Sequence, residues 1–102
     1  MRLTPAQVQA IRDSATAVFG ADAQVWLFGS RVDDARRGGD IDLLVQPPPD
    51  LAMDDASAWR CKLDLLGHLE RRLGERNIDV IIERPGDDRP IVRVARETGI
   101  SL

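Results

Sequence analysis

This chain of 102 residues contains no tyrosine, one cysteine and one histidine, and only 4% of its residues are aromatic. The single cysteine, Cys61, excludes a disulfide within the chain. It is expected to lie on an amphipathic helix and to face the core of the domain. His68 stands alone among leucines, so a helix surface or a partner contact explains it better than a metal site. The chain thus offers no nucleophilic triad.

Long hydrophobic runs and a basic charge balance are also missing. No apolar stretch approaches the roughly 20 residues of a membrane-spanning helix, and no basic and apolar signal segment opens the chain, so we expect a cytoplasmic protein. The net charge is −3 and the isoelectric point is about 5.0. This balance lacks the electrostatic footprint of a DNA-binding or RNA-binding surface and argues against direct nucleic-acid binding.

Helical and extended patterns alternate along one domain, residues 1–102, which predicts an α/β fold. A capping box at Thr4 with Pro5 at the first helical position starts a helix that Gly20 ends. A longer helix is expected from about Asp54 to Leu73, followed by a last helix between Asp88 as its cap and Gly99 as its end. The residues expected to face inward are Val8, Ile11, Ala15 and Val18 in the first helix; Ala58, Cys61, Leu65, Leu69 and Leu73 in the second; and Ile91, Val94 and Ala95 in the third.

The second helix carries Trp59, Leu63 and Leu66 partly off its apolar stripe. A helix so apolar around its circumference could bury a second face against another chain, and Trp59 could equally pack on the sheet of its own domain. The sequence leaves both arrangements open.

Three short apolar runs predict strands at residues 24–28, 40–45 and 78–82. The first ends at Gly29, and the second runs into Pro47, Pro48 and Pro49, which block continuation of a central strand and make a stiff exit.

The turn after the first strand suggests phosphate binding. Gly29 lets backbone approach a ligand closely, and Ser30 adds a hydroxyl and an amide. Helical turning after it would aim free N–H groups at an anion. Arg31 supplies a forked, permanently charged donor beside that turn, and Arg36 and Arg37 bring two more across the loop. A triphosphate is the ligand that these groups suit best.

Asp40 and Asp42 are two residues apart in a predicted strand, so their carboxylates project from the same face. Ile41, Leu43 and Val45 take the other face and supply burial. Paired carboxylates favour a hard cation such as Mg²⁺ or Mn²⁺. Asp79 interrupts another apolar strand, and a neighbouring strand carrying Asp40 and Asp42 would explain it. Three carboxylates suit two metal ions about 3.5–4 Å apart.

At this point the chain resembles the nucleotidyltransferase superfamily related to DNA polymerase beta. Gly29-Ser30, then Asp40-Ile41-Asp42 and a later Ile78-Asp79-Val80 carry the resemblance. Gly-Ser-Arg with an Asp-Ile-Asp-Leu strand in a short chain is more narrowly similar to the minimal nucleotidyltransferases, and residues 90–99 resemble that group's terminal segment. Many members have serine before the first metal-binding aspartate, where this chain has Gly39, so the departure bears on substrate geometry.

The resemblance implies a small mixed β-sheet flanked by helices and Mg²⁺-dependent transfer of AMP from ATP, with Mn²⁺ as an alternative metal. It implies that Asp40, Asp42 and Asp79 are catalytic and hold two metal ions, and that Gly29, Ser30 and Arg31 contact the nucleotide. Stand-alone members resemble antitoxins whose partner is an all-helical HEPN ribonuclease toxin, adenylylated on a tyrosine. Because this chain has no tyrosine, that acceptor must belong to the partner.

Other interpretations remain at this point. An Asp-x-Asp pair is common by chance and often marks only the entry to a strand, and the arginines could be ordinary solvated loop charges. A calcium loop fits poorly, because Asp42 leads into apolar residues. The chain could instead be an antitoxin that binds nucleotide and occludes its partner without catalysis. It could also modify a small molecule, although such enzymes normally need an additional helical domain.

Overall fold

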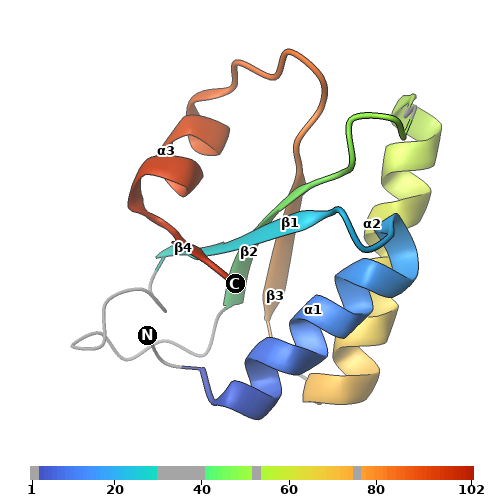
Figure 1. Cartoon of the computed structure of the whole chain (residues 1–102), viewed down its shortest axis with the longest axis vertical. Coiled ribbons are helices and arrows are strands. Elements are labelled where there is room, and N and C mark those ends of the chain that lie inside the picture. Colours follow the sequence, from blue (N-terminus) through green and yellow to red (C-terminus); the bar gives the residue numbers. More distant parts are fainter. Residues whose placement is uncertain (1–2, 30–40, 52–53, 75–76) are drawn as a thin grey trace.

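The computed structural model describes residues 3–29, 41–51, 54–74 and 77–102 (Figure 1). The elements follow in the order α1 (Pro5–Phe19), β1 (Gln24–Phe28), β2 (Ile41–Gln46), α2 (Asp55–Leu73), β3 (Ile78–Ile82), α3 (Pro90–Thr98) and β4 (Ile100–Ser101). The strands form one mixed sheet in the order β3-β2-β1-β4. β1 runs antiparallel to β2 and β4, whereas β3 runs parallel to β2. The predicted α/β class with a mixed sheet is confirmed.

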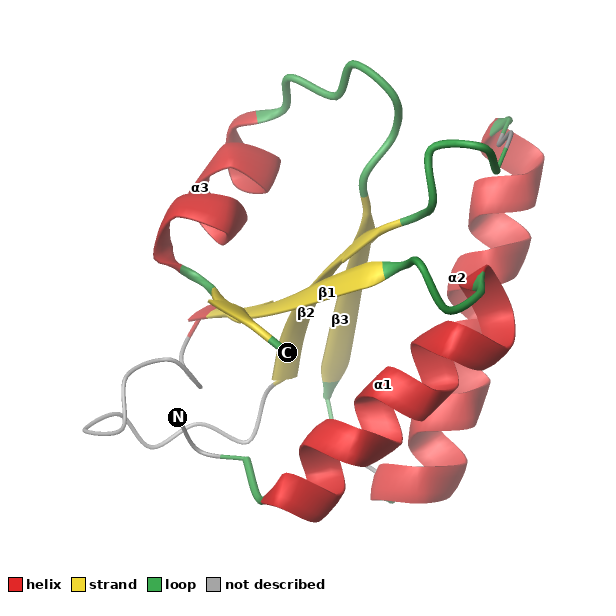
Figure 2. Cartoon of the chain, in the orientation of Figure 1, coloured by secondary structure: helices red, strands yellow, loops and turns green. Residues whose placement is uncertain are grey.

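The sheet lies between two layers of helices, with α1 and α2 on one face and α3 on the other (Figure 2). Side chains alternate along β1, β2 and β3, so each of these strands contributes to both layers. Residues facing α1 and α2 include Leu27, Ile41, Leu43, Val45 and Val80. Residues on the α3 face include Phe28 and Leu44, which pack with Val92 and Ala95.

The first two helices begin and end where the sequence predicts. The Thr4 N–H donates to Gln7 Oε1 over 2.9 Å, and the Gln7 N–H donates to Thr4 Oγ1 over 3.1 Å, which completes the capping box. The Asp54 carboxylate accepts from the Ser57 N–H over 2.7 Å and caps α2. Both predicted helices are therefore confirmed, with Gly20 and Gly74 at their ends.

Side chains of α2 range from fully buried to largely exposed. Leu65 and Leu69 are buried in the main core, and Cys61 is partly buried against it as expected. Trp59 is 61% exposed and Leu63 is 50% exposed. Leu66, the third off-stripe residue, is partly buried against the main core, whereas Trp59 and Leu63 keep half or more of their surface exposed.

The prediction for α3 is wrong in its cap and in its inward face. The residue at the N-cap is Arg89, with no side-chain cap, and Asp88 lies one residue earlier. Ile91 and Val94 are 42% and 47% exposed, whereas Val92 and Ala95 are buried. Ala95 was expected inward and is confirmed there.

A short fourth strand, β4, was not predicted. Its residue Ile100 pairs with Leu27 of β1, directly after Gly99 ends α3. A Cβ at Gly99 would lie 2.9 Å from the Leu27 carbonyl oxygen and overlap the Ala95 carbonyl. Glycine is therefore needed at this point, where the helix end meets the sheet. Among the described elements, none is a helix with the length and apolarity required to cross a bilayer.

Candidate functional site

Two of the three predicted metal-binding aspartates lie side by side. Asp42 is the second residue of β2, Asp79 is the second residue of β3, and the parallel register pairs them directly. Neighbouring strands are about 4.8 Å apart, so carboxylates at paired positions share one face of the sheet. Like charges placed directly opposite each other are destabilising in a sheet unless a cation compensates them.

Gly29 lies beside the same carboxylate. It follows β1 with a φ of +78°, a conformation that side chains other than glycine rarely adopt. A Cβ built on Gly29 would overlap Asp42 Oδ2 and lie 3.1 Å from Asp42 Cγ. The absence of a side chain at residue 29 thus gives the Asp42 carboxylate its place against the turn.

Phe28 belongs to the same row, although its sequence pattern predicts only the end of a strand. It pairs with Asp42 across β1 and β2, so Phe28, Asp42 and Asp79 occupy successive positions across three strands. Phe28 is 8% exposed and packs in the small core beneath α3. Antiparallel pairing of the strands on either side of residues 29–40 would have placed Phe28 opposite Asp42, and this pairing is the signal that could have identified Phe28.

Burial on the opposite face fixes the two aspartates. Ile41, Leu43 and Val80 precede or follow them along their strands and are 0% exposed against α1 and α2. Asp42 is partly buried and Asp79 is exposed. Because the apolar neighbours anchor both strands in one register, the carboxylates are presented on a rigid sheet with access to solvent at Asp79.

The other predicted site residues, Ser30, Arg31 and Asp40, lie outside the described residues, as do Arg36 and Arg37. Among the residues that the structure does describe, no group of three histidine, cysteine or acidic side chains is arranged to hold a metal. The described part of the candidate site therefore consists of Gly29, Asp42 and Asp79, with Phe28 beside them.

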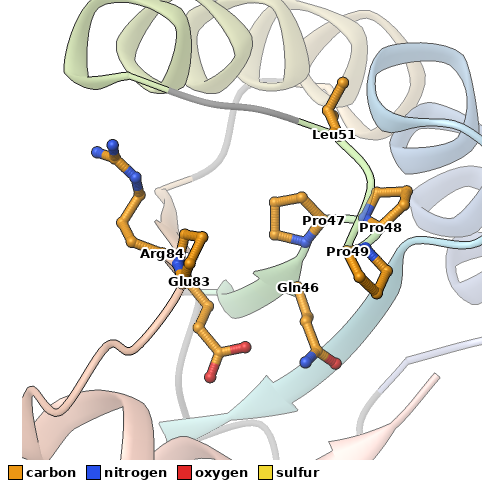
Figure 3. Close-up of a pocket in the computed structure, with 8 residues that line it drawn as sticks. Gln46, Pro47, Pro48, Pro49, Leu51, Glu83 and Arg84 are labelled. Carbon is orange, nitrogen blue, oxygen red and sulfur yellow. The ribbon is translucent and has the colours of Figure 1, made fainter.

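A cavity of about 240 Å³ lies at the other end of β2 and β3, where both strands leave the sheet (Figure 3). Proline rings from residues 47–49 and Pro85 form much of its wall. Its charged side chains already have partners: Arg84 donates to Asp55 over 2.6 Å, and Glu83 pairs with Arg96. We therefore place the candidate site at the aspartates rather than in this cavity.

A further ion pair stabilises the loop between β3 and α3. The Arg89 guanidinium donates to Asp87 Oδ2 over 2.6 Å and to the Ile82 carbonyl over 3.0 Å. Hydrogen bonding from Arg89 holds the pKa of Asp87 well below its ordinary value of 3.8. This pair connects the loop to the end of β3, away from the Asp42 and Asp79 positions.

Comparison with models of known protein families, with curated proteins and with solved structures finds no match to this chain.

Proposed function

We propose that this chain is a Mg²⁺-dependent nucleotidyltransferase that transfers AMP from ATP to a hydroxyl group, most simply a tyrosine, of a partner HEPN-domain toxin and so acts as its antitoxin. The observation that carries the proposal is the pairing of Asp42 with Asp79 beside the Gly29 turn. The sequence resemblance to minimal nucleotidyltransferases supplies the reaction and the partner.

The donor set fits a hard divalent cation. Carboxylate oxygens are the ligands that Mg²⁺ and Mn²⁺ prefer, and the exposed Asp79 lies beside the partly buried Asp42 at one end of the sheet face. Asp42 and Asp79 would hold the metal together with Asp40, which precedes β2 by one residue. When bound, the metal would neutralise phosphate charge and lower the pKa of an attacking hydroxyl.

The protein's own part in the reaction is positioning and proton transfer. Gly29 and Ser30 would hold the β and γ phosphates through backbone N–H groups, with Arg31 as a further phosphate contact. The acceptor oxygen would form a bond to the α-phosphorus as the bond to the pyrophosphate oxygen breaks. The hydroxyl proton would pass to the exposed Asp79 carboxylate, and pyrophosphate would leave.

An acceptor on another molecule fits both the composition and the fold. The chain contains no tyrosine to modify. The described elements form one sheet with its covering helices, and every element except β4 contributes side chains to the core. The partner would therefore present its hydroxyl to the end of the sheet face where Asp79 is exposed.

The test is transfer of labelled AMP from ATP with Mg²⁺, using the product of the adjacent gene as acceptor and intact mass as the readout. Wild type is compared with Asp42→Asn and Asp79→Asn, which remove charge while keeping side-chain size. Asp88→Asn is the matched control, because Asp88 is an exposed aspartate in the loop before α3.

A gain of AMP on the partner that requires both Asp42 and Asp79, but not Asp88, supports the proposal. We expect each active-site variant to lose at least about a hundredfold in rate. Full transfer by Asp42→Asn would overturn the metal assignment. A stable complex without any transfer would instead indicate a protein that binds and occludes its partner without catalysis.

A further inference from the structure

The cavity at the ends of β2 and β3 is separate from the aspartate pair. Gln46, which lines it, lies four residues after Asp42 in β2, a distance of about 13 Å along a strand. Leu44 lies between them and is 0% exposed in the small core beneath α3. The volume of about 240 Å³ is below the about 300–1,000 Å³ of sites for drug-sized ligands, so the cavity suits one ring system rather than a whole nucleotide.

Proline fixes the apolar walls of this cavity. Pro47, Pro48 and Pro49 follow β2 directly, and Pro85 lines the cavity from the segment after β3. A proline ring locks φ and has almost no side-chain freedom to lose, so these walls are already in place before a ligand binds. Leu51 adds a further apolar side chain. Rigid, flat and apolar walls favour a planar ring as the ligand.

The two charged side chains that line the cavity are both neutralised. Arg84 Nη1 donates to Asp55 Oδ1 over 2.6 Å. Arg96 Nη2 donates to Glu83 Oε2, and the Glu83 side chain is only 11% exposed. Because Arg84 and Glu83 also carry opposite charges, the lining offers no unbalanced charge to an ionic ligand. The cavity therefore favours a neutral one.

Two polar groups can select that neutral ligand. The Gln46 amide supplies a carbonyl acceptor and an NH₂ donor, and it forms no hydrogen bond within the described part of the chain. Glu83 keeps Oε1 as an acceptor, because Arg96 binds Oε2. Gln46 and Glu83 directly follow the paired residues Val45 and Ile82, and Figure 3 shows their side chains extending in the same direction. One edge of a ligand can therefore meet both.

We propose that this cavity binds the adenine base of a nucleoside, packed against the proline rings. The Gln46 carbonyl accepts one hydrogen of the exocyclic amino group, and the Gln46 NH₂ group donates to the adjacent ring nitrogen. Glutamine pairs in this way with adenine in protein–DNA complexes. Glu83 Oε1 accepts the second amino hydrogen. A base with a carbonyl in place of the amino group would instead present an acceptor to two acceptors.

This inference does not depend on the proposed nucleotidyl transfer. The contacts involve neither a metal ion nor a phosphate group, and Asp42 and Asp79 take no part in them. Adenosine without metal is therefore the probe, because it lacks the groups that the aspartates and the Gly29 turn would bind. The adenine site and the transfer reaction can each fail without the other.

The first test is calorimetric titration of the whole chain with adenosine. Gln46→Leu should weaken binding at least about tenfold, because it removes both amide hydrogen bonds and keeps a side chain of similar size. Gln24→Leu is the matched control: Gln24 pairs with Gln46 across β1 and β2 but does not line the cavity. It should bind adenosine like wild type, and circular dichroism checks that both variants fold.

The second test compares adenosine with inosine, which carries a carbonyl where adenosine has the amino group. We expect inosine to bind at least about tenfold more weakly. In nuclear magnetic resonance spectra, adenosine should shift the side-chain amide signals of Gln46 and leave those of Gln24 in place.

Several outcomes would overturn the proposal. These are no binding of adenosine at millimolar concentrations, unchanged binding by Gln46→Leu, or equal binding of inosine. Asp79→Asn tests the location: it should bind adenosine like wild type. Loss of binding in that variant would place the base at the aspartates instead of in the cavity.

Discussion

Asp42 Oδ2 occupies the space that a Cβ on Gly29 would need, so a side chain at residue 29 would have to displace the Asp42 carboxylate. The same glycine has a φ of +78°. Residue 29 must therefore adopt a positive φ and also leave space for the Asp42 carboxylate, and substitutions can distinguish these two requirements.

Gly29→Ala should destabilise the fold more than Gly74→Ala does. Both glycines have nearly the same φ, +78° and +80°, but a Cβ at Gly74 meets nothing within 4 Å. The difference in free energy of unfolding then measures the collision with Asp42, and we expect about 1–3 kcal/mol by denaturant titration.

A double-mutant cycle identifies the collision partner. In an Asp42→Ala background, Gly29→Ala should lose its extra cost and match Gly74→Ala. An unchanged cost would assign the strain to contacts other than Asp42.

Mg²⁺ should stabilise wild type through the paired carboxylates. At ten times its dissociation constant, a ligand that binds only the folded state adds about 1.4 kcal/mol to the free energy of unfolding. Asp79→Asn should gain little stability when Mg²⁺ is added, because it removes one of the two paired carboxylates.

Thermal melts with and without Mg²⁺ or Mn²⁺ measure how much the metal stabilises wild type and Asp79→Asn. Asp22→Asn is the control, because Asp22 is an exposed aspartate in the turn between α1 and β1. Equal stabilisation of wild type and Asp79→Asn by the metal would remove Asp79 from the ligand set.

Asp87→Asn should lower the free energy of unfolding at pH 7 by about 1–3 kcal/mol, because it weakens a charged hydrogen bond to Arg89. The folded-state pKa of Asp87 is depressed below 3.8, so its contribution is complete above that pH and declines as the pH falls toward the folded-state pKa. Stability curves of wild type and variant should therefore converge in acid. Asp88→Asn should stay within about 0.5 kcal/mol of wild type at pH 7.

Shortening single side chains of α3 should distinguish its buried face from its exposed face. Val92 is 3% exposed in the small core with Phe28 and Leu44, whereas Val94 is 47% exposed. We expect Val92→Ala to cost about 1–3 kcal/mol and Val94→Ala to cost less than about 0.5 kcal/mol, measured from denaturant midpoints. Equal effects would mean that α3 packs on the sheet in another orientation.

The α3 result shows what sequence periodicity can decide and what it cannot. In α1 and α2 the apolar residues recur on one stripe with clear caps at Thr4 and Asp54, so the sequence specified both elements. α3 has nine residues, and both Ile91 and Val92 are apolar, so its pattern allows two inward faces. The choice depends on contacts with Phe28 and Leu44, which come from distant strands.

The candidate site was also predictable in part. Alternation within residues 41–45 and 78–82 placed Asp42 and Asp79 on strand faces, and the register that pairs them agrees with the expectation of neighbouring strands. The predicted roles of Ser30, Arg31 and Asp40 stay predictions, since these residues lie outside the described ranges. Two residues of β4 are too few for any alternation to show, so the pairing of Ile100 with Leu27 depended on the tertiary fold.

The alternation of Asp42 with Ile41 and Leu43 also constrains how this chain can vary. Inserting or deleting one residue within β2 would turn its carboxylate toward α1 and α2 and move a leucine of the main core to the opposite face. Such a change would lose the fold together with the site. Selection for a folded protein alone would therefore remove length changes in this strand and preserve the geometry of the aspartate pair, whatever reaction the pair performs.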